Sequence, residues 1–426
     1  MKVNDIHELF LKCNSISIDT RKIVPNSFFV CIKGERFDAN TFAKEALEKG
    51  ASFVLIDNSN YYIDNRTILV EDSLKSLQEL SQFHRQFLKI PIIALTGSNG
   101  KTTTKELIQV VLSKKYNAKA TVGNLNNHIG VPLTLLSFDK KTEIGIVEMG
   151  ANHQKEIEFL CGIAQPDFGY ITNFGKAHLE GFGGIEGVIK GKSEMYSYLL
   201  KNGKTAFVNL DDPIQVDKTK GIDVYSFGTN SKANINITSV KANPFVQIEF
   251  LNTIIISQLI GLYNANNISA AITIGKYFKV ADSDIKTAIE NFVPDNNRSQ
   301  LLTRNTNEII LDAYNANPSS MKVAIENFIQ LKKANKIAIL GDMFELGSES
   351  LEEHNKTIDL LINNDEIKTY FVGKDFYMNK LEKENLEFFE TFDDFSEVFK
   401  NNQFSNAMIL IKGSRGMALE RVLEFI

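Results

Sequence analysis

Hydrophobic and polar residues follow one another along this chain in blocks typical of α/β proteins. Short continuous apolar runs, as expected of buried strands, are separated by longer stretches with apolar residues three and four positions apart, as on one helix face. Residues 92–95 form such an apolar run, a glycine loop follows at residues 97–102, and then Leu107, Val110 and Val111 recur at helical spacing. This order predicts a buried strand, a loop and a helix.

The first part of the chain has its own strand and helix pattern. Residues 27–32 and 52–56 are predicted strands, residues 41–49 a helix, and residues 73–88 a longer helix that leads to Pro91. We therefore expect a small α/β domain over residues 1–87.

The middle of the chain predicts a mostly parallel sheet. Apolar runs at residues 144–148 and 168–173 end in polar residues, as strands of a doubly wound sheet do where they approach a ligand. Residues 233–240 and 246–256 instead show period-2 alternation, which predicts an antiparallel appendage. We expect these elements to form a central domain over residues 88–299.

From residue 300 onward strands and helices alternate regularly, which predicts a Rossmann-like α/β domain over residues 300–426. The predicted strands cover residues 308–313, 336–340, 369–372 and 408–411, and the predicted helices cover residues 319–331 and 351–362, a segment near Phe395, and residues 418–425.

Length and composition agree with a multidomain globular protein and exclude several other classes. At 426 residues, the chain is long enough for two or three domains. The net charge of −5 argues against nucleic acid as a partner. No apolar run is long enough to span a membrane and the first residues do not resemble a secretion signal, so we expect a cytoplasmic protein without membrane insertion. Nothing in the pattern indicates an exposed apolar seam, and we expect a monomer.

Three cysteines, Cys13, Cys31 and Cys161, lie far apart in the sequence with no CxxC pair. An odd number at such spacing indicates neither a disulfide framework nor a zinc site. We interpret the three as buried small hydrophobic residues.

The glycine loop is the strongest candidate for a binding site. In Gly97-Ser98-Asn99-Gly100-Lys101-Thr102, backbone N–H groups could approach phosphate oxygens closely, and the following helix N-terminus would add positive potential. Lys101 would reach the terminal phosphates, and the Thr102 hydroxyl would bind a magnesium ion. The spacing is GxxGKT rather than the common GxxxxGK[ST], so a turn with a surface lysine is the alternative. The flanking strand and helix favour phosphate binding, with ATP as the expected nucleotide.

Three further residues are candidates for the chemistry. Glu148 closes the run IGIVE where a metal-binding carboxylate belongs, although strand-end glutamates are also common in surface turns. His178 follows the strand ending in ITN, and Lys192 lies fourteen residues later. Taken alone, this histidine is more often a loop residue and this lysine a solvated helix residue.

Together these motifs resemble the Mur ligase family, the ATP-dependent amide ligases of peptidoglycan precursor assembly, over essentially the whole chain. TGSNGKTTTKE (residues 96–106) is similar to the shortened phosphate loop of that family. The strings that resemble one branch, which adds D-alanyl-D-alanine to UDP-N-acetylmuramoyl-tripeptide, are VEMGANHQKEI, ITNFGKAHLEGFG, DAYNANPSSM, LGDMFELG and KGSRGM. SIDTRK and FFVCIKGERFDAN are similar to the uridine-nucleotide domain of the family, which would make residues 1–87 the UDP-substrate-binding domain.

The resemblance implies roles for individual residues. It assigns Lys101 to the ATP phosphates, Thr102 and Glu148 to a first magnesium, and His178 and Lys192 to a second, with Lys192 carried as a carbamate. The implied nucleotide contacts are Gly97, Ser98, Asn99, Gly100, Lys101, Thr102, Thr103, Asn267, Arg298 and Asp312. The implied substrate contacts are Asp19, Thr20, Arg21, Lys33, Gly34, Asn124, Asn126, Asn127, Thr172 and Asn173.

The resemblance also implies a mechanism, in which ATP converts the tripeptide carboxylate into an acyl phosphate that the dipeptide amine then attacks. Two alternatives remain at this point. One is a nucleotide-binding module or regulatory ATPase that ligates nothing, and the other is an amide ligase for a folate or an amino-acid polymer. The N-terminal domain and the strings YNANP and GDMFELG count against the second alternative.

Overall fold

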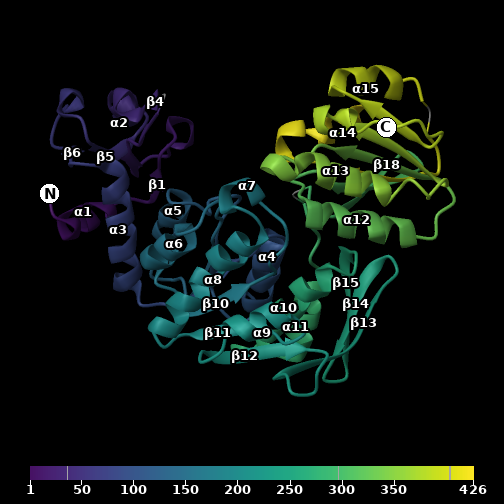
Figure 1. The fold of residues 1–426 in the computed structure, drawn as a ribbon. Helices are drawn as coiled ribbons and strands as arrows, with labels where there is room; N and C mark the ends of the chain where they lie inside the picture. The colour runs from purple at the N-terminus through teal and green to yellow at the C-terminus, as the bar shows by residue number, and fades with distance from the viewer. Residues whose placement is uncertain (36, 296, 403) are drawn as a thin grey trace.

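The computed structural model describes residues 1–35, 37–295, 297–402 and 404–426, and it has three α/β units, each built on its own main sheet. Figure 1 shows the N-terminal unit (purple) and the C-terminal unit (green to yellow) standing apart on either side of the central unit. The predicted three-part α/β class is confirmed.

The N-terminal unit contains a four-stranded parallel sheet in the order β1-β2-β5-β6. Its strands are β1 (Ser15–Ser17), β2 (Ser27–Val30), β5 (Ala51–Ile56) and β6 (Thr67–Leu69), with the short hairpin β3 (Lys33–Gly34) and β4 (Phe37–Asp38) beside them. Its helices are α1 (Val3–Phe10), α2 (Ala43–Glu48) and α3 (Ser73–Leu88). Of the three cysteines, Cys31 and Cys161 are buried as predicted, whereas Cys13 is only partly buried.

Two buried histidines connect the N-terminal unit to the central one. The ring nitrogens His7 Nε2, on α1, and His84 Nδ1, on α3, are hydrogen-bonded at 2.9 Å. His84 Nε2 lies 2.9 Å from the carbonyl oxygen of Phe138, which belongs to the central unit. Because that carbonyl only accepts, His84 Nε2 carries a proton and His84 Nδ1 accepts from His7 Nε2.

The central unit contains a nine-stranded sheet in the order β15-β14-β13-β12-β11-β10-β7-β9-β8. The parallel strands are β7 (Ile92–Thr96), β8 (Ala118–Ala120), β9 (Ile144–Glu148), β10 (Phe168–Ile171), β11 (Thr205–Asn209) and β12 (Asp223–Gly228). The helices are α4 (Lys101–Leu112), α5 (Gly130–Leu136), α6 (Glu156–Ala164), α7 (Leu179–Phe182), α8 (Ile185–Lys201), α9 (Pro213–Lys218), α10 (Asn264–Tyr277) and α11 (Asp282–Glu290).

Alternate residues of the central strand β7 pack on opposite faces of the sheet. Ile93 and Leu95 join the apolar cluster that includes α4 and α10, whereas Ile92 and Ala94 join the cluster on the face of α6 and α8. Burial on both faces explains why the strand is apolar throughout.

The antiparallel appendage extends the same sheet instead of forming a separate unit. Strand β13 (Ile235–Ala242) pairs in parallel with β12 and antiparallel with β14 (Phe245–Phe250), which pairs antiparallel with β15 (Thr253–Ile260). The prediction of one strand over residues 246–256 was wrong. Leu251 and Asn252 both have positive φ, 43° and 62°, and turn the chain there into a hairpin.

The C-terminal unit contains a six-stranded sheet in the order β16-β17-β21-β18-β19-β20, parallel except for the edge strand β16. The strands are β16 (Gln300–Arg304), β17 (Asn307–Asp312), β18 (Lys336–Gly341), β19 (Ile367–Val372), β20 (Leu386–Phe389) and β21 (Met408–Lys412). The helices are α12 (Pro318–Gln330), α13 (Ser350–Asp359), α14 (Lys374–Met378) and α15 (Phe392–Phe399). The predicted helix over residues 418–425 is instead a 3-10 segment, Leu419–Phe425.

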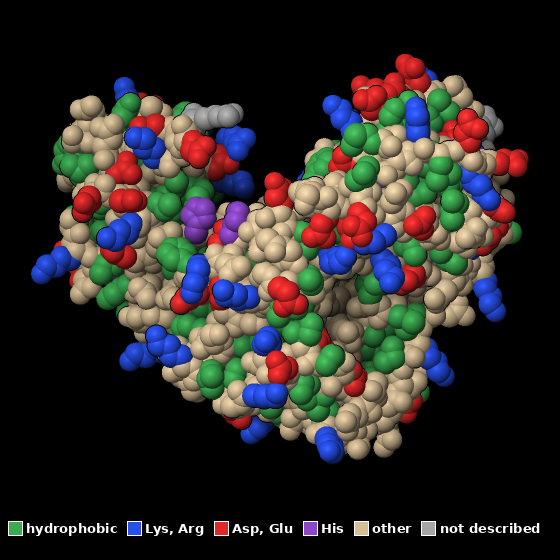
Figure 2. All heavy atoms as spheres, in the orientation of Figure 1, with side chains coloured by type: hydrophobic (Ala, Val, Ile, Leu, Met, Phe, Trp, Pro, Cys, Tyr) green, Lys and Arg blue, Asp and Glu red, His purple; other side chains and the backbone are tan. Residues whose placement is uncertain are grey.

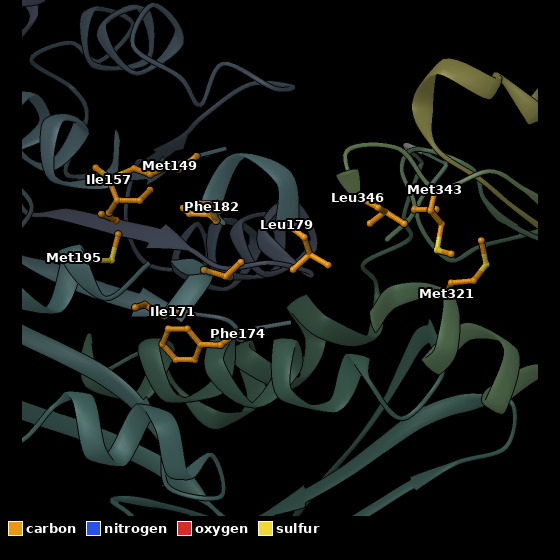
Figure 3. Packing of buried hydrophobic residues seen from close by; sticks show 14 of the residues in the cluster. Met149, Ile157, Ile171, Phe174, Leu179, Phe182, Met195, Met321, Met343 and Leu346 are labelled. Atoms are coloured by element: carbon orange, nitrogen blue, oxygen red, sulfur yellow. The ribbon is translucent and has the colours of Figure 1, made fainter. Parts of the chain in front are cut away.

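One apolar cluster crosses from the central unit into the C-terminal unit. Phe174 and Leu179 of the central unit belong to the same buried cluster as Met321, Met343 and Leu346 of the C-terminal unit. Figure 3 shows Leu179 facing Leu346 and Met343 across the junction. This contact positions the edge of the C-terminal unit beside the glycine loop.

Candidate active site

The glycine loop connects β7 directly to α4, as the sequence predicts. Gly100 occupies the N-cap position of α4 with φ of +78°, a conformation that glycine adopts without strain. A Cβ atom at Gly100 would lie 2.6 Å from Asn267 Oδ1, so the residue is also required by close packing. The loop therefore presents its backbone and the first turn of α4 to the adjoining space.

Lys101 is folded back over its own loop. Its Nζ donates to the carbonyl oxygens of Gly97 at 2.6 Å and Ser98 at 3.2 Å. Loss of hydration lowers the pKa of Lys101 to about 8, the Arg298 charge acts in the same direction, and Glu148 opposes it. A poorly hydrated ammonium bound only to carbonyls can turn toward an anionic ligand at little cost.

The end of the neighbouring strand β10 holds the glycine loop. Thr172 Oγ1 donates to the carbonyl oxygen of Asn99 at 2.6 Å, and Asn173 Nδ2 donates to the same oxygen at 3.0 Å. The backbone N–H of Asn99 returns a bond to Asn173 Oδ1 at 3.1 Å. Thr172 and Asn173, which the sequence suggested as substrate contacts, lie here as supports of the loop.

Glu148 lies beside the loop because β9 pairs with β7, with Glu148 opposite Leu95. Its carboxylate is 2% exposed, and Oε1 accepts from Asn126 Nδ2 at 2.8 Å. Oε2 has no hydrogen-bond partner among the described residues. A buried carboxylate oxygen without a partner is costly, so the donor set fits a cation bound next to the phosphate loop.

The asparagine-rich loop that contains Asn126 lines the same space. Asn127 Oδ1 accepts from the backbone N–H groups of Ile129 and Gly130 and thereby caps the start of α5, whereas Asn124 is exposed. Of the three predicted asparagines, Asn126 is the one tied to the candidate metal carboxylate.

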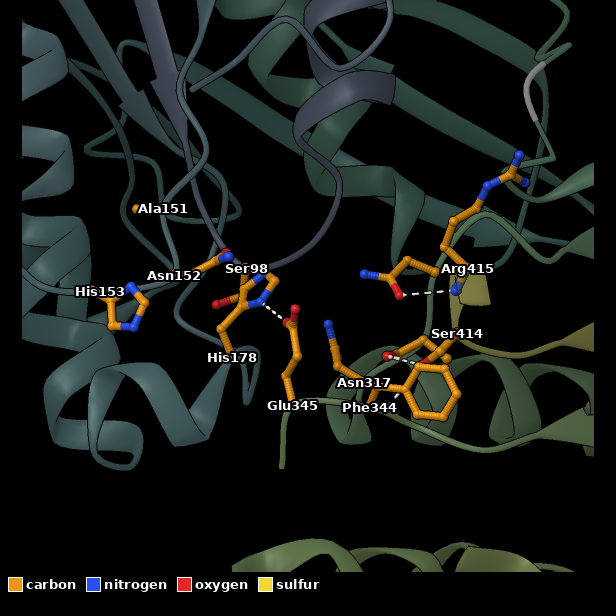
Figure 4. Close-up of polar contacts among 12 residues, drawn as sticks. Ser98, Ala151, Asn152, His153, His178, Asn317, Phe344, Glu345, Ser414 and Arg415 are labelled. Carbon is orange, nitrogen blue, oxygen red and sulfur yellow. Dashed lines mark hydrogen bonds and ion pairs between the residues drawn. The ribbon is translucent and has the colours of Figure 1, made fainter. Parts of the chain in front are cut away.

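His178 and Lys192 lie deeper on the side of α7 and α8. His178 Nδ1 is hydrogen-bonded to Glu345 Oε2 of the C-terminal unit (Figure 4), and burial lowers the pKa of the imidazole. Lys192 on α8 is fully buried, with Nζ donating to the carbonyl oxygen of Ala151 at 3.4 Å. Burial is also the main cause that lowers the pKa of Lys192 well below its usual value, with the nearby Lys101 charge second.

The candidate adenosine and phosphate contacts come from the two facing units. Asn267 on α10 accepts from Thr104 Oγ1 at 3.0 Å. The Arg298 guanidinium stacks 3.6 Å from the centre of the Tyr314 ring, and its Nε has no partner among residues that the structure describes. Asp312 accepts from the backbone N–H of Ser299 at 3.1 Å and from Lys412 Nζ at 2.6 Å.

These groups surround one cavity of about 1310 Å³, which is open between the units (Figure 2). The predicted residues that line it are Ser98, Asn99, Gly100, Lys101, Thr102, Thr103, Asn124, Asn126, Asn127, Glu148, Asn173, His178, Asn267, Arg298 and Asp312. Leu74 and Gln78 of α3 extend its wall toward the N-terminal unit.

The remaining predicted residues do not line this cavity. They are Gly97, Thr172 and Lys192 of the central unit and Asp19, Thr20, Arg21, Lys33 and Gly34 of the N-terminal unit. Asp19 caps the short turn that begins at Thr20 and forms an ion pair with the exposed Arg21 at 2.8 Å. Lys33 and Gly34 are exposed on the β3–β4 hairpin.

The described part of the chain holds no group of three or more His, Cys, Asp or Glu side chains arranged to hold a metal ion. A complete set of protein ligands for a metal is therefore not present among these residues.

The structure also shows residues of the cavity and of the adjoining junction between the units that the sequence reasoning missed. Asn317 Nδ2 donates to Asn99 Oδ1 at 2.7 Å, which ties the start of α12 to the glycine loop. Lys176 forms an ion pair with the buried Glu353 at 2.6 Å across the same junction. Lys412 is 1% exposed beside Asp312. Asn317 and Lys412 belong to the strings DAYNANPSSM and KGSRGM, but neither position carries a pattern that alone distinguishes it from a surface residue.

Comparison with known proteins identifies the family. The Mur ligase middle domain matches residues 95–275, and the Mur ligase glutamate ligase domain matches residues 297–415. The chain belongs to the Mur ligase family. A Mur ligase of Bacillus subtilis, UDP-N-acetylmuramoyl-tripeptide--D-alanyl-D-alanine ligase, is 34% identical over 96% of this chain and 92% of its own length.

Solved structures of Mur ligases agree with this assignment. MurF from Acinetobacter baumannii superposes with a TM-score of 0.85 at 28% identity, covering 99% of this chain and 98% of that one. MurF from Thermotoga maritima in complex with ADP superposes with a TM-score of 0.84 at 26% identity, covering 98% and 97%. Within the described residues, no helix has the length and apolar character needed to cross a membrane.

Proposed function

We propose that this Mur ligase joins D-alanyl-D-alanine to UDP-N-acetylmuramoyl-tripeptide, with hydrolysis of ATP to ADP and phosphate. The observation that carries the proposal is the large cavity. It brings the GxxGKT loop, Glu148 and Arg298 of residues 88–299 together with Asp312 and Lys412 of the C-terminal unit. The near full-length similarity to curated ligases of this specificity supports the choice of substrates.

The first half of the reaction activates a carboxylate, which by itself is a poor electrophile. The tripeptide carboxylate attacks the γ-phosphorus of ATP in line, an acyl phosphate forms and ADP leaves. Lys101 exchanges its loop carbonyls for the terminal phosphate oxygens, so that two anions can approach each other. The glycine loop and the N-terminus of α4 hold the nucleotide in place.

Magnesium fits this site. Thr102 and Glu148 would hold a first ion, and His178 and Lys192 would serve a second. When bound, the metal neutralises charge on the terminal phosphates. The unpartnered Oε2 of Glu148 is the atom of this chain that most needs such a partner.

Lys192 would act in this site as a carbamate. Its low pKa, caused by burial, favours the neutral amine, which can attack carbon dioxide; a C–N bond forms, one proton is released and a carboxylate results. An anion at this position would attract the metal, whereas an ammonium would be repelled.

In the proposed reaction each domain has its own role. Residues 1–87 bind the UDP end of the substrate, residues 88–299 bind ATP, and residues 300–426 close over the nucleotide. We further propose that the protein acts as a monomer in the cytoplasm, where ATP is available. Light scattering on purified protein would test the monomer.

Phosphate release measured with purified protein, ATP and magnesium tests the reaction. We expect turnover only when UDP-N-acetylmuramoyl-tripeptide and D-alanyl-D-alanine are both present, with a product whose mass equals the two joined minus water. Release of phosphate from ATP alone at the same rate would instead support a regulatory ATPase. Turnover with a folate or amino-acid acceptor in place of the UDP substrate would support the other ligase class.

A further inference from the structure

Asn40 is fully buried in the N-terminal unit, although its side chain is a polar amide. It lies in the short 3-10 turn Ala39–Phe42, which follows directly after the β3–β4 hairpin. A buried amide is stable only when its hydrogen bonds are satisfied inside the protein. The partners of Asn40 therefore show what this side chain holds in place.

Asn40 connects two aspartates that belong to different elements. Its Nδ2 donates to Asp38 Oδ1, on β4, at 2.7 Å and to Asp57 Oδ1, just after β5, also at 2.7 Å. Its Oδ1 accepts from the backbone N–H of Asp57 at 3.1 Å, and its own backbone N–H donates to Asp38 Oδ1 at 2.9 Å. Hydrogen bonds to carboxylates are stronger than those between neutral groups, so Asn40 fixes the hairpin against the end of β5.

The hairpin on one side of Asn40 carries two of the residues expected to contact the UDP substrate. Lys33 lies opposite Asp38 in the pairing of β3 with β4, and Lys33 and Gly34 are exposed. Figure 1 shows β4 on the side of the N-terminal unit that is turned toward the C-terminal unit. A short two-stranded ladder is hardly stable by itself, so the place of Lys33 depends on what holds Asp38.

The aspartate on the other side of Asn40 is connected to the wall of the large cavity. Asp57 Oδ2 accepts from the backbone N–H of Ser73, the first residue of α3, at 3.2 Å. Further along α3, Gln78 lines the large cavity, and its Nε2 donates to the carbonyl oxygen of His128 in the central unit at 3.0 Å. Asn40 therefore links the hairpin to a helix that is itself attached to the central unit.

We propose that Asn40 is a positioning residue for the UDP end of the substrate. By holding Asp38 and Asp57 together, it sets the place of the β3–β4 hairpin relative to α3 and the large cavity. This inference rests on the proposed function and deepens it. Because the hairpin lies far from the reacting carboxylate, loss of Asn40 should weaken binding of the UDP end and leave the chemical step unchanged.

The test measures, by calorimetry on the full chain, the binding of UDP-N-acetylmuramoyl-tripeptide and of its two halves, UDP and N-acetylmuramoyl-tripeptide. Asn40→Ala should raise the Kd of the whole substrate and of UDP about 10-fold, because the bonds that join two carboxylates are lost. The Kd of N-acetylmuramoyl-tripeptide, the Kd of ATP and kcat at saturating substrate should stay within about 2-fold of wild type.

Three further variants make the test specific. Asn40→Asp keeps the shape but places a third carboxylate between Asp38 and Asp57, and it should weaken UDP binding at least as much as Asn40→Ala. Asn40→Asp combined with Asp57→Asn exchanges the amide and the carboxylate, which restores the bond between these two positions and should recover part of the loss. Asn58→Ala is the matched control, since Asn58 Oδ1 caps the next 3-10 turn through the backbone N–H of Asn60 at 3.0 Å, and it should leave every Kd unchanged.

The outcomes separate this inference from general damage to the N-terminal unit and from the proposed function. An equal loss of binding for UDP and N-acetylmuramoyl-tripeptide would overturn the positioning role, because a misfolded unit also displaces α3 from the cavity wall. Unchanged UDP binding in Asn40→Ala would overturn it as well, and a double variant no better than Asn40→Asp would count against the bridge. Failure of the wild type to ligate, while UDP binding still depends on Asn40, would overturn the proposed function alone.

Discussion

The charged residues that line the large cavity or lie close to it, and those of the N-terminal unit, lie in opposite surroundings. Glu148 and Lys192 are buried and only partly partnered, and Lys101 is bound to carbonyls of its own loop. In contrast, Arg21 is 85% exposed at its side chain and is already paired with Asp19. An exposed ion pair of this kind contributes little to stability. Arg21 can therefore exchange Asp19 for a part of the substrate that lies far from the reacting carboxylate.

This difference indicates which step each region can affect. Charges in a poorly hydrated cavity act strongly on a reacting group, and their loss should lower kcat. Charges at an exposed surface far from the reaction contribute uniform binding, and their loss should raise KM alone. Three experiments test this division, from the largest expected effect to the smallest, and a fourth measures how the stability of the N-terminal unit depends on pH.

Lys101→Ala should have the largest effect. Removing the one lysine of the glycine loop should lower kcat about 10³-fold or more, because the negative charge on the γ-phosphate loses its main side-chain partner. Phosphate release with both substrates measures it. Lys114→Ala, at an exposed position just beyond α4, is the matched control and should behave as wild type. Near-normal turnover of Lys101→Ala would refute the role given to this lysine.

Lys192→Ala should lower kcat about 10²-fold, and short carboxylates such as formate or acetate should restore part of the activity by replacing the missing carbamate. Lys192→Arg keeps a positive charge but cannot form the carbamate. Its kcat should therefore be as low as that of Lys192→Ala, and an added neutral amine should not raise it. Lys190→Ala, on the exposed side of the same helix, is the control. A complete lack of rescue at any carboxylate concentration would count against the carbamate.

Arg21→Ala should raise the KM of the UDP substrate about 10-fold and leave kcat unchanged, as expected for binding energy that is equal in ground and transition states. Arg66→Ala is a closely matched control, since Arg66 pairs with Asp64 in the same i, i+2 arrangement at 2.6 Å on the same unit. Equal effects of the two substitutions would mean that neither position reads the substrate. A fall in kcat for Arg21→Ala would break the comparison between the regions.

The buried histidine pair predicts a modest dependence of stability on pH. Burial lowers the pKa of His7 to about 4, and the charge of His84 acts in the same direction. Burial also lowers the pKa of His84, and the hydrogen bond to the Phe138 carbonyl, followed by the Asp139 charge, opposes this shift. Unfolded histidines take up a proton near pH 6.5 while the native pair resists it. The free energy of unfolding should therefore fall as the pH drops from about 6.5 toward 4, by about 2–3 kcal/mol.

Urea unfolding at a series of pH values measures this dependence. His7→Phe removes one titrating ring at a position already surrounded by Phe10, Phe83 and Phe87, and should reduce the slope below pH 6.5 by about half. Parallel curves for variant and wild type between pH 7.5 and 5 would show that His7 does not carry the effect.

Much of the fold follows from local patterns. The run at residues 92–95 and the helical spacing of Leu107, Val110 and Val111 place β7 and α4 correctly, because a strand buried on both faces must be apolar throughout. The errors in the predicted elements arise where one local pattern is compatible with two different structures. Period-2 alternation over residues 246–256 continues through a hairpin turn at Leu251 and Asn252, since both strands bury alternate residues in the same core.

The sequence by itself determined the three-part α/β class, the glycine loop and the choice of Lys101 as its phosphate-binding candidate. These features depend on residues close together in the chain. The tertiary structure alone decided which distant side chains face one another. The pair of Asn317 with Asn99 and the pair of Lys176 with Glu353 both form where two separately folded units meet. Such contacts depend on how whole sheets and helices pack, and no local spacing of residues encodes that packing.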